Sequence, residues 1–103
     1  MVSIPGALTP TEIVSADNAG ADFVKLFPIT SLGASYLKAV RAPLSSVKFL
    51  AVGGINLDNI KEYLAAGALG FGIGGNIADK RLIENGDYAS ISELCEKYVL
   101  AVQ

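Results

Sequence analysis

Histidine is absent from the 103-residue sequence, and cysteine occurs once, at Cys95. The absence of histidine excludes Ser-His-Asp and Cys-His catalysis within this chain and removes the commonest protein ligand of metal ions. We therefore expect no zinc site, and a single cysteine cannot form an internal disulfide. Catalysis by this chain would have to use lysine, carboxylates, hydroxyl groups or backbone dipoles.

The sequence also has no basic cluster and no long hydrophobic run. Its net charge is −2, which argues against nucleic acid as the main ligand. No apolar segment is long enough to span a bilayer, and no charged segment followed by an apolar stretch marks a signal peptide. We therefore expect a cytoplasmic protein that acts on neither nucleic acid nor membrane. Hydrophobic residues make up 51% of the chain, which predicts one packed domain over residues 1–103.

Segments typical of strands alternate with segments typical of helices. Strands are expected at residues 2–4, 22–27, 47–52 and 69–73, and helices at about 9–19, 33–41, 56–66, from 76, and 90–103. The first helix has the clearest start, because Thr9 can cap it and Glu12 completes a capping box. The last helix is expected to bury one apolar stripe, which consists of Ile91, Leu94, Cys95, Tyr98 and Val99. Such alternation predicts a parallel sheet whose carboxyl-end loops gather on one side.

The number of strands limits the architecture. Four strands at most are present, whereas an eight-stranded TIM-type (β/α)8 barrel typically needs about 250 residues. The chain is therefore interpreted as the second half of such a barrel. A half-barrel leaves two sheet edges unpaired and its inner face uncovered, and both features favour association. A small open sheet is the alternative.

One charged residue, Lys25, interrupts the strand expected at residues 22–27. Side chains alternate along a strand, so Phe23, Lys25 and Phe27 share one face. If both faces are covered, desolvation lowers the pKa of the lysine amine, and a neutral amine can form a Schiff base with a carbonyl group. The alternative is a lysine whose side chain extends to the sheet edge and stays charged.

Two glycine pairs, Gly53-Gly54 and Gly74-Gly75, follow two consecutive predicted strands. At the carboxyl ends of strands in a βα barrel, such loops bind phosphate, because glycine lets backbone N–H groups approach the oxygens closely. A helix beginning near Asn76 would add the positive end of its dipole. The alternative is a pair of ordinary tight turns. Together with Lys25, the phosphate interpretation indicates a phosphorylated keto substrate and cleavage of a carbon–carbon bond.

Four segments in this order resemble a known family. The chain is similar to the C-terminal half of the 2-keto-3-deoxy-6-phosphogluconate aldolases, which also include 4-hydroxy-2-oxoglutarate aldolases. The resemblance rests on Ile4-Pro5-Gly6 with Thr9-Pro10-Thr11-Glu12, Val24-Lys25-Leu26-Phe27-Pro28, Val52-Gly53-Gly54-Ile55 and Gly72-Ile73-Gly74-Gly75-Asn76. These segments extend over nearly the whole chain, and the Lys-x-Phe-Pro segment is the most diagnostic of them.

The resemblance implies a class I aldolase, usually a trimer, that needs no metal or other cofactor. Its reaction cleaves 2-keto-3-deoxy-6-phosphogluconate into pyruvate and glyceraldehyde 3-phosphate, and close relatives act on the galactonate-derived isomer. The resemblance implies that Lys25 forms the Schiff base and that Phe27 lines the pocket. The phosphate would be held by Gly53, Gly54, Gly74, Gly75 and Asn76.

The sequence departs from the family at three points. Asn76 stands where relatives often carry serine, and Val52 stands where they often carry threonine. The glutamate that acts as general acid and base, and an arginine that binds the substrate carboxylate, belong to the family's N-terminal half and have no counterpart here. Glu12 is better explained by its capping box. General acid–base help is worth about two to four orders of magnitude in rate, so the isolated chain is expected to be weak or inactive.

Two non-catalytic alternatives stay open. The chain could bind a sugar phosphate without forming a covalent adduct, or it could be a structural fragment that pairs with itself or with a missing half-barrel.

Overall fold

The computed structural model describes all 103 residues. One sheet contains four parallel strands in the order β1 (Gly6–Ala7), β2 (Val24–Leu26), β3 (Phe49–Val52) and β4 (Gly70–Gly72). The helices are α1 (Pro10–Asn18), α2 (Ala34–Arg41), α3 (Ile60–Ala65), α4 (Lys80–Glu84) and α5 (Tyr88–Ala101). The predicted alternation and the parallel α/β sheet are confirmed. No helix combines the length and apolar character needed to cross a membrane.

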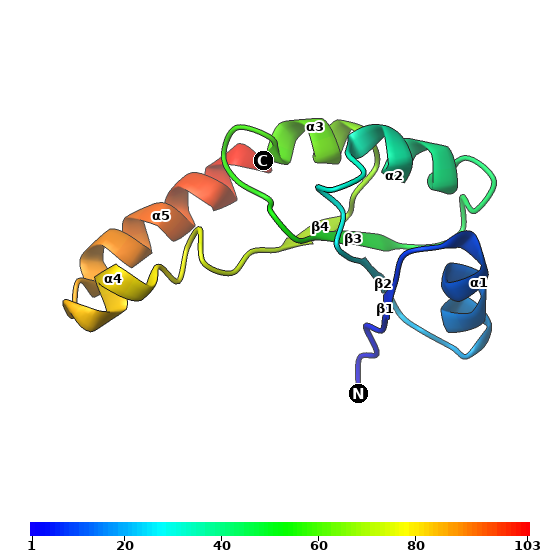
Figure 1. Ribbon diagram of the computed structural model, residues 1–103, viewed down its shortest axis with the longest axis horizontal. Coiled ribbons are helices and arrows are strands. Elements are labelled where there is room, and N and C mark those ends of the chain that lie inside the picture. The colour runs from blue at the N-terminus through cyan, green and yellow to red at the C-terminus, as the bar shows by residue number, and fades with distance from the viewer.

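The two faces of the sheet differ in their cover. Helices α2 and α3 lie on one side of the strands, and no helix covers β3 from the other side (Figure 1). Side chains on the helix-covered face are buried, namely those of Val24, Leu26, Phe49 and Ala51. Side chains on the opposite face, called here the open face, are half-buried, namely those of Lys25, Leu50 and Val52. The alternation predicted around Lys25 is thus confirmed, but only one face is covered.

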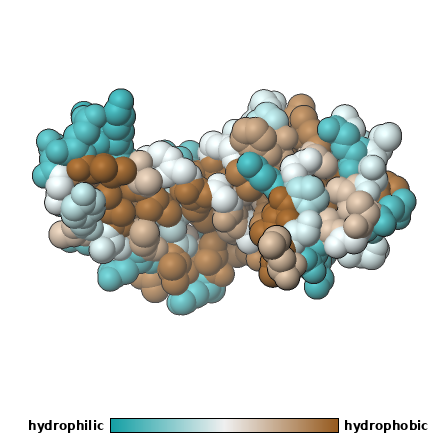
Figure 2. All heavy atoms as spheres, turned by 90° about the horizontal axis from the view of Figure 1, so that it is seen from below, coloured by the Kyte–Doolittle hydropathy of each residue, from teal (hydrophilic) through white to brown (hydrophobic).

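The chain has an extended shape, with α4 and α5 projecting away from the sheet (Figure 1). Its radius of gyration is 14.7 Å, compared with about 13 Å for a compact domain of about 100 residues. Only 16 of the 103 residues are buried, and hydrophobic atoms spread across much of the surface seen from below (Figure 2). All-parallel sheets are normally covered on both faces. The chain therefore exposes a surface of the kind that such sheets ordinarily bury.

The first strand begins later than the sequence predicted. Regular pairing starts at β1, after Pro5, instead of at residues 2–4. Ser3 still runs beside the chain that leads into β2, because its N–H donates to the Asp22 carboxylate at 2.8 Å and its carbonyl accepts the Asp22 N–H at 3.0 Å. Pro5 has no backbone N–H, so it cannot donate a hydrogen bond to a neighbouring strand, and regular pairing begins only after it.

The helix predicted near Asn76 also begins later. Asn76 lies in a turn, and α4 starts at Lys80 with Asp79 as its cap, since the Asp79 carboxylate accepts the N–H of Arg81 at 2.8 Å. The Asn76 side chain is engaged with the carbonyl of Ile55 instead. The prediction that a helix begins near Asn76 and directs the positive end of its dipole toward the glycine loops was therefore wrong.

Helix α5 buries less of its apolar stripe than predicted. It begins at Tyr88, two residues before the predicted start, and Asp87 caps it through the N–H of Ser90 at 3.2 Å. Of the five residues predicted to be buried, only Tyr98 is. The other four are half-buried (Ile91, Leu94) or exposed (Cys95, Val99). The helix projects away from the sheet (Figure 1), so most of this stripe has no packing partner.

Candidate functional site

Lys25 is held on an inner strand of the sheet, with its side chain on the open face. Its backbone N–H donates to the carbonyl of Pro5 at 2.8 Å, and its side chain is half-buried. The amine nitrogen lies 4.6 Å from the centroid of the Phe27 ring, two residues further along the chain. No carboxylate pairs with this amine, because the single ion pair of the structure joins Lys80 to Glu84. The amine is thus directed toward the carboxyl end of β2.

The loop after β3 requires its two glycines. Gly53 has φ = 101° and Gly54 has φ = 73°, values that L side chains rarely adopt. A Cβ atom at Gly53 would lie 3.1 Å from the Phe27 ring, and one at Gly54 would lie 2.3 Å from Oγ1 of Thr30. This loop therefore packs closely against the segment that follows Lys25, and Gly53 lies directly beside the Phe27 ring.

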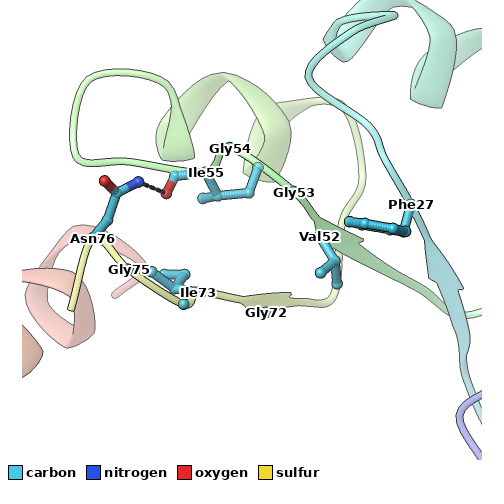
Figure 3. A pocket seen from close by; sticks show the side chains of 10 residues that line it. Phe27, Val52, Gly53, Gly54, Ile55, Gly72, Ile73, Gly75 and Asn76 are labelled. Carbon is cyan, nitrogen blue, oxygen red and sulfur yellow. Dashed lines mark hydrogen bonds between the residues drawn. The ribbon is translucent and has the colours of Figure 1, made fainter. Parts of the chain in front are cut away.

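The two glycine pairs border one open hollow of about 490 Å3. Phe27 lies at one end of the hollow and Asn76 at the other, and the loops after β3 and β4 form its two sides (Figure 3). The lining residues are Phe27, Val52, Gly53, Gly54, Ile55, Gly72, Ile73, Gly74, Gly75 and Asn76. The structure thus brings together the phosphate residues predicted from the resemblance, and Phe27 borders both this hollow and the Lys25 amine.

Several backbone N–H groups at this hollow have no acceptor in the chain. They belong to Gly53, Gly54, Ile55, Gly74, Gly75 and Asn76. Backbone N–H groups in folded proteins are nearly always paired with protein groups or solvent. A row of such donors, on two loops that face the same hollow, is suited to the oxygens of an anion.

Two asparagine side chains fix the positions of these loops. Asn76 donates from Nδ2 to the carbonyl of Ile55 at 2.8 Å and so joins the loop after β4 to the loop after β3. Asn59 donates from Nδ2 to the carbonyl of Gly54 at 3.0 Å. Both bonds engage carbonyl oxygens of the loop after β3. The N–H groups of this loop at the hollow take no part in them and remain free to donate to a ligand.

Asn59 was missed by sequence reasoning, although a signal was present. Asn56 accepts the N–H of Asn59 at 3.0 Å, and Asn59 Oδ1 accepts the N–H of Asn56 at 2.9 Å. This exchange is a capping box in which asparagine takes the place of glutamate or glutamine. The carbonyl of Asn56 also accepts the N–H of Ile60 at 3.0 Å, so helical hydrogen bonding starts at Asn56, as predicted, although the regular helix α3 starts at Ile60. The spacing of Asn56 and Asn59 was the usable signal.

Fold and site together define a class of protein. The chain consists of successive βα units with a parallel sheet, and its candidate site lies at the carboxyl ends of the strands, where βα proteins bind their ligands.

Within that class, the chain belongs to the KDPG and KHG aldolase family, whose family model matches residues 1–94. A protein of Rhizobium meliloti (strain 1021) named "Probable 2-dehydro-3-deoxy-6-phosphogalactonate aldolase" is 42% identical over 78 residues, which cover 75% of this chain and 37% of that protein. The 2-dehydro-3-deoxy-phosphogluconate aldolase of Pseudomonas aeruginosa is 33% identical over 93 residues, which cover 88% of this chain and 42% of that protein.

A solved structure described as "Native KDPGal structure" superposes with a TM-score of 0.80 at 34% identity. The match covers 100% of this chain and 50% of that chain. The chain therefore spans half or less of the length of these three similar proteins.

Proposed function

We propose that this chain supplies the Schiff-base lysine and the phosphate-binding loops of a class I aldolase. Its substrate would be 2-keto-3-deoxy-6-phosphogluconate, and its products pyruvate and glyceraldehyde 3-phosphate. One observation carries the proposal: the Lys25 amine lies over the Phe27 ring, 4.6 Å from its centroid, and Phe27 also lines the hollow of free N–H groups. A nucleophile and an anion site thus adjoin a common apolar wall, as a phosphorylated keto acid requires.

In the proposed reaction, the Lys25 amine attacks the keto carbon C2 and water leaves, which gives an iminium ion. The bond between C3 and C4 then breaks, and its electron pair moves into the iminium to form an enamine. The C4 hydroxyl loses its proton as the aldehyde forms. Protonation of the enamine and hydrolysis release pyruvate and restore the amine. Phe27 would reduce access of water to the amine at the start of this sequence.

The phosphate group would accept hydrogen bonds from the free backbone N–H groups at the hollow. Charge-assisted hydrogen bonds from backbone donors to an anion are stronger than neutral ones. The proposed donors are the N–H groups of Gly53, Gly54, Gly74, Gly75 and Asn76, together with the N–H of Ile55, which is also free and at the same hollow. For Asn76 the backbone N–H takes this role, since one side-chain N–H is already bonded to Ile55.

We also propose that the sheet is half of an eight-stranded barrel and that the proton-transfer group comes from outside these residues. Glu12 does not supply it, because its carboxylate accepts the Thr9 N–H at 3.0 Å and the Thr9 hydroxyl at 2.7 Å. The half-barrel interpretation is supported by the uncovered open face and by the share of its relatives that the chain spans. The chain alone is therefore proposed to be weak or inactive in cleavage, and to act as part of an oligomer or with a second half-barrel.

A second substrate is favoured by one observation. The relative from Rhizobium meliloti, at 42% identity, is named for the phosphogalactonate isomer. Comparing kcat/KM for the two isomers in the completed enzyme decides between these substrates.

The lysine assignment is tested by borohydride reduction of the chain in the presence of pyruvate, followed by peptide mass spectrometry. We expect a reduced adduct on Lys25 and none in Lys25→Arg, because a guanidinium does not form an imine under these conditions. Lys48→Arg is the matched control, since Lys48 is also placed over an aromatic ring, 5.7 Å from the centroid of Phe23, but lies outside the site. An adduct of equal yield in Lys25→Arg, or none in a folded wild-type sample, contradicts the assignment.

A further inference from the structure

We infer that Asn59 is a positioning residue for the anion-binding N–H groups, acting with Asn76 through two carbonyls of the loop after β3. The inference rests on the proposed function, because it assigns the supports of the same phosphate-binding loops. Neither asparagine side chain needs to touch the anion in this role. We call the two bonds, Asn59 to Gly54 and Asn76 to Ile55, the carbonyl tethers.

The first tether orients a peptide plane. Asn59 Nδ2 lies 3.0 Å from the carbonyl oxygen of Gly54. A trans peptide is planar, so the N–H of Ile55 points away from that carbonyl. Ile55 lines the hollow, and its N–H donates to no group of the chain. Holding the Gly54 carbonyl therefore fixes the direction in which the Ile55 N–H is presented.

The tether is needed because the loop is built from glycine. Gly53 and Gly54 both have positive φ angles, and glycine has more backbone freedom to lose than any other residue. The capping box with Asn56 anchors Asn59 at the last position before α3, where helical hydrogen bonding has already begun. Asn59 thus transmits the position of the helix to the loop that would bind the anion.

The second tether joins the two loops. Asn76 Nδ2 lies 2.8 Å from the carbonyl oxygen of Ile55, a residue 21 positions earlier in the chain, and this bond is drawn in Figure 3. It spans the end of the hollow opposite Phe27. The two tethers therefore hold the adjacent carbonyls of Gly54 and Ile55. The second of them also sets the separation of the two glycine loops.

The test compares Asn59→Asp with Asn56→Asp in the full chain. An aspartate at position 59 can still accept the Asn56 N–H, but it has no N–H to donate to Gly54. An aspartate at position 56 adds the same charge in the same turn and keeps both of its accepted hydrogen bonds, from Asp58 and Asn59 at 2.9 and 3.0 Å. The pair therefore separates loss of the tether from added negative charge.

Inorganic phosphate is the probe, and its dissociation constant is measured from backbone amide shifts of the hollow in NMR titrations. We expect Asn59→Asp to bind phosphate about fivefold more weakly than Asn56→Asp, the effect of one lost hydrogen bond. Thermal unfolding checks that both variants are folded, which we expect because both retain the cap. Equal phosphate affinities in the two folded variants would overturn the inference.

Asn76→Ala keeps the test decisive if Asn59→Asp fails to fold. It removes the second tether without adding charge, and we expect a similar loss of about fivefold against wild type. Unchanged phosphate affinity in Asn76→Ala would overturn the shared role of the tethers. If wild type itself binds no phosphate, the proposed phosphate site fails and the inference fails with it, whereas wild-type binding with unaffected variants removes only the inference.

Discussion

Glu12 links the stability of the chain to pH at the scale of one residue. Its pKa lies below the ordinary value of 4.5, chiefly because the backbone N–H of Thr9 donates to the carboxylate, and also because the Thr9 side chain does. A lowered folded-state pKa means that the unfolded chain binds the proton more tightly. This contribution to stability is therefore present above pH 4.5 and is lost as the pH falls through the lowered pKa.

Thermal or urea unfolding of wild type and Glu12→Gln across that range checks the prediction. We expect wild type to lose stability on acidification more steeply than Glu12→Gln, because the amide does not titrate. Parallel curves for wild type and Glu12→Gln would contradict the assignment.

Contacts between residues that are close in the sequence could be predicted, whereas contacts between distant residues could not. Thr9 and Glu12 were predicted correctly because a capping box depends on neighbours three positions apart. The engagement of Asn76 was not predicted, because its acceptor, the Ile55 carbonyl, is 21 positions away and becomes a neighbour only when β3 and β4 pair. Cys95 was misplaced in the core for a related reason, since an apolar stripe is buried only if something packs on it.

At the scale of elements, the helices differ in how firmly they are held. Helix α2 buries Ala34, Leu37 and Val40 within eight residues, whereas α5 buries only Tyr98 within fourteen. Local opening costs least where few apolar contacts are lost. We expect the amides of α5 to exchange with solvent deuterium faster than those of α2, as measured residue by residue by NMR. Equal or greater protection of α5 would contradict this prediction and would mean that α5 packs against another molecule in solution.

The order of elements was predictable because it depends on local patterns. Each strand that the sequence predicted is present and parallel, apart from the first, which is displaced beyond Pro5. The placement of Lys25 on the face opposite Val24 and Leu26 followed from alternation alone. What alternation could not reveal is which face is covered, because that depends on the whole set of helices and on any further strands.

At the scale of the whole molecule, the open face predicts association. Leu50 lies in the middle of that face, paired in register with Lys25 on one side and Gly70 on the other. We expect wild type to self-associate as its concentration rises into the micromolar range, because an uncovered apolar sheet face favours contact. Leu50→Lys should shift the chain toward monomer in sedimentation equilibrium, since burial of an unpaired charge is costly.

Leu57→Lys is the matched control for this substitution, because Leu57 is 38% exposed and precedes α3, outside the open face. It should leave the association of the chain unchanged. A wild-type chain that stays a folded monomer at these concentrations would contradict the prediction.

The separation of strand and loop also bears on how such a chain could diversify. Lys25 is fixed by backbone bonds within the sheet, whereas every free N–H at the hollow belongs to a loop that is supported by side chains of its own. Substitutions at Asn59 or Asn76 alter the second set without moving the first. Under the proposed function, affinity for the anionic group and the position of the Lys25 amine could therefore change independently, by single substitutions in the loops that leave the sheet unaltered.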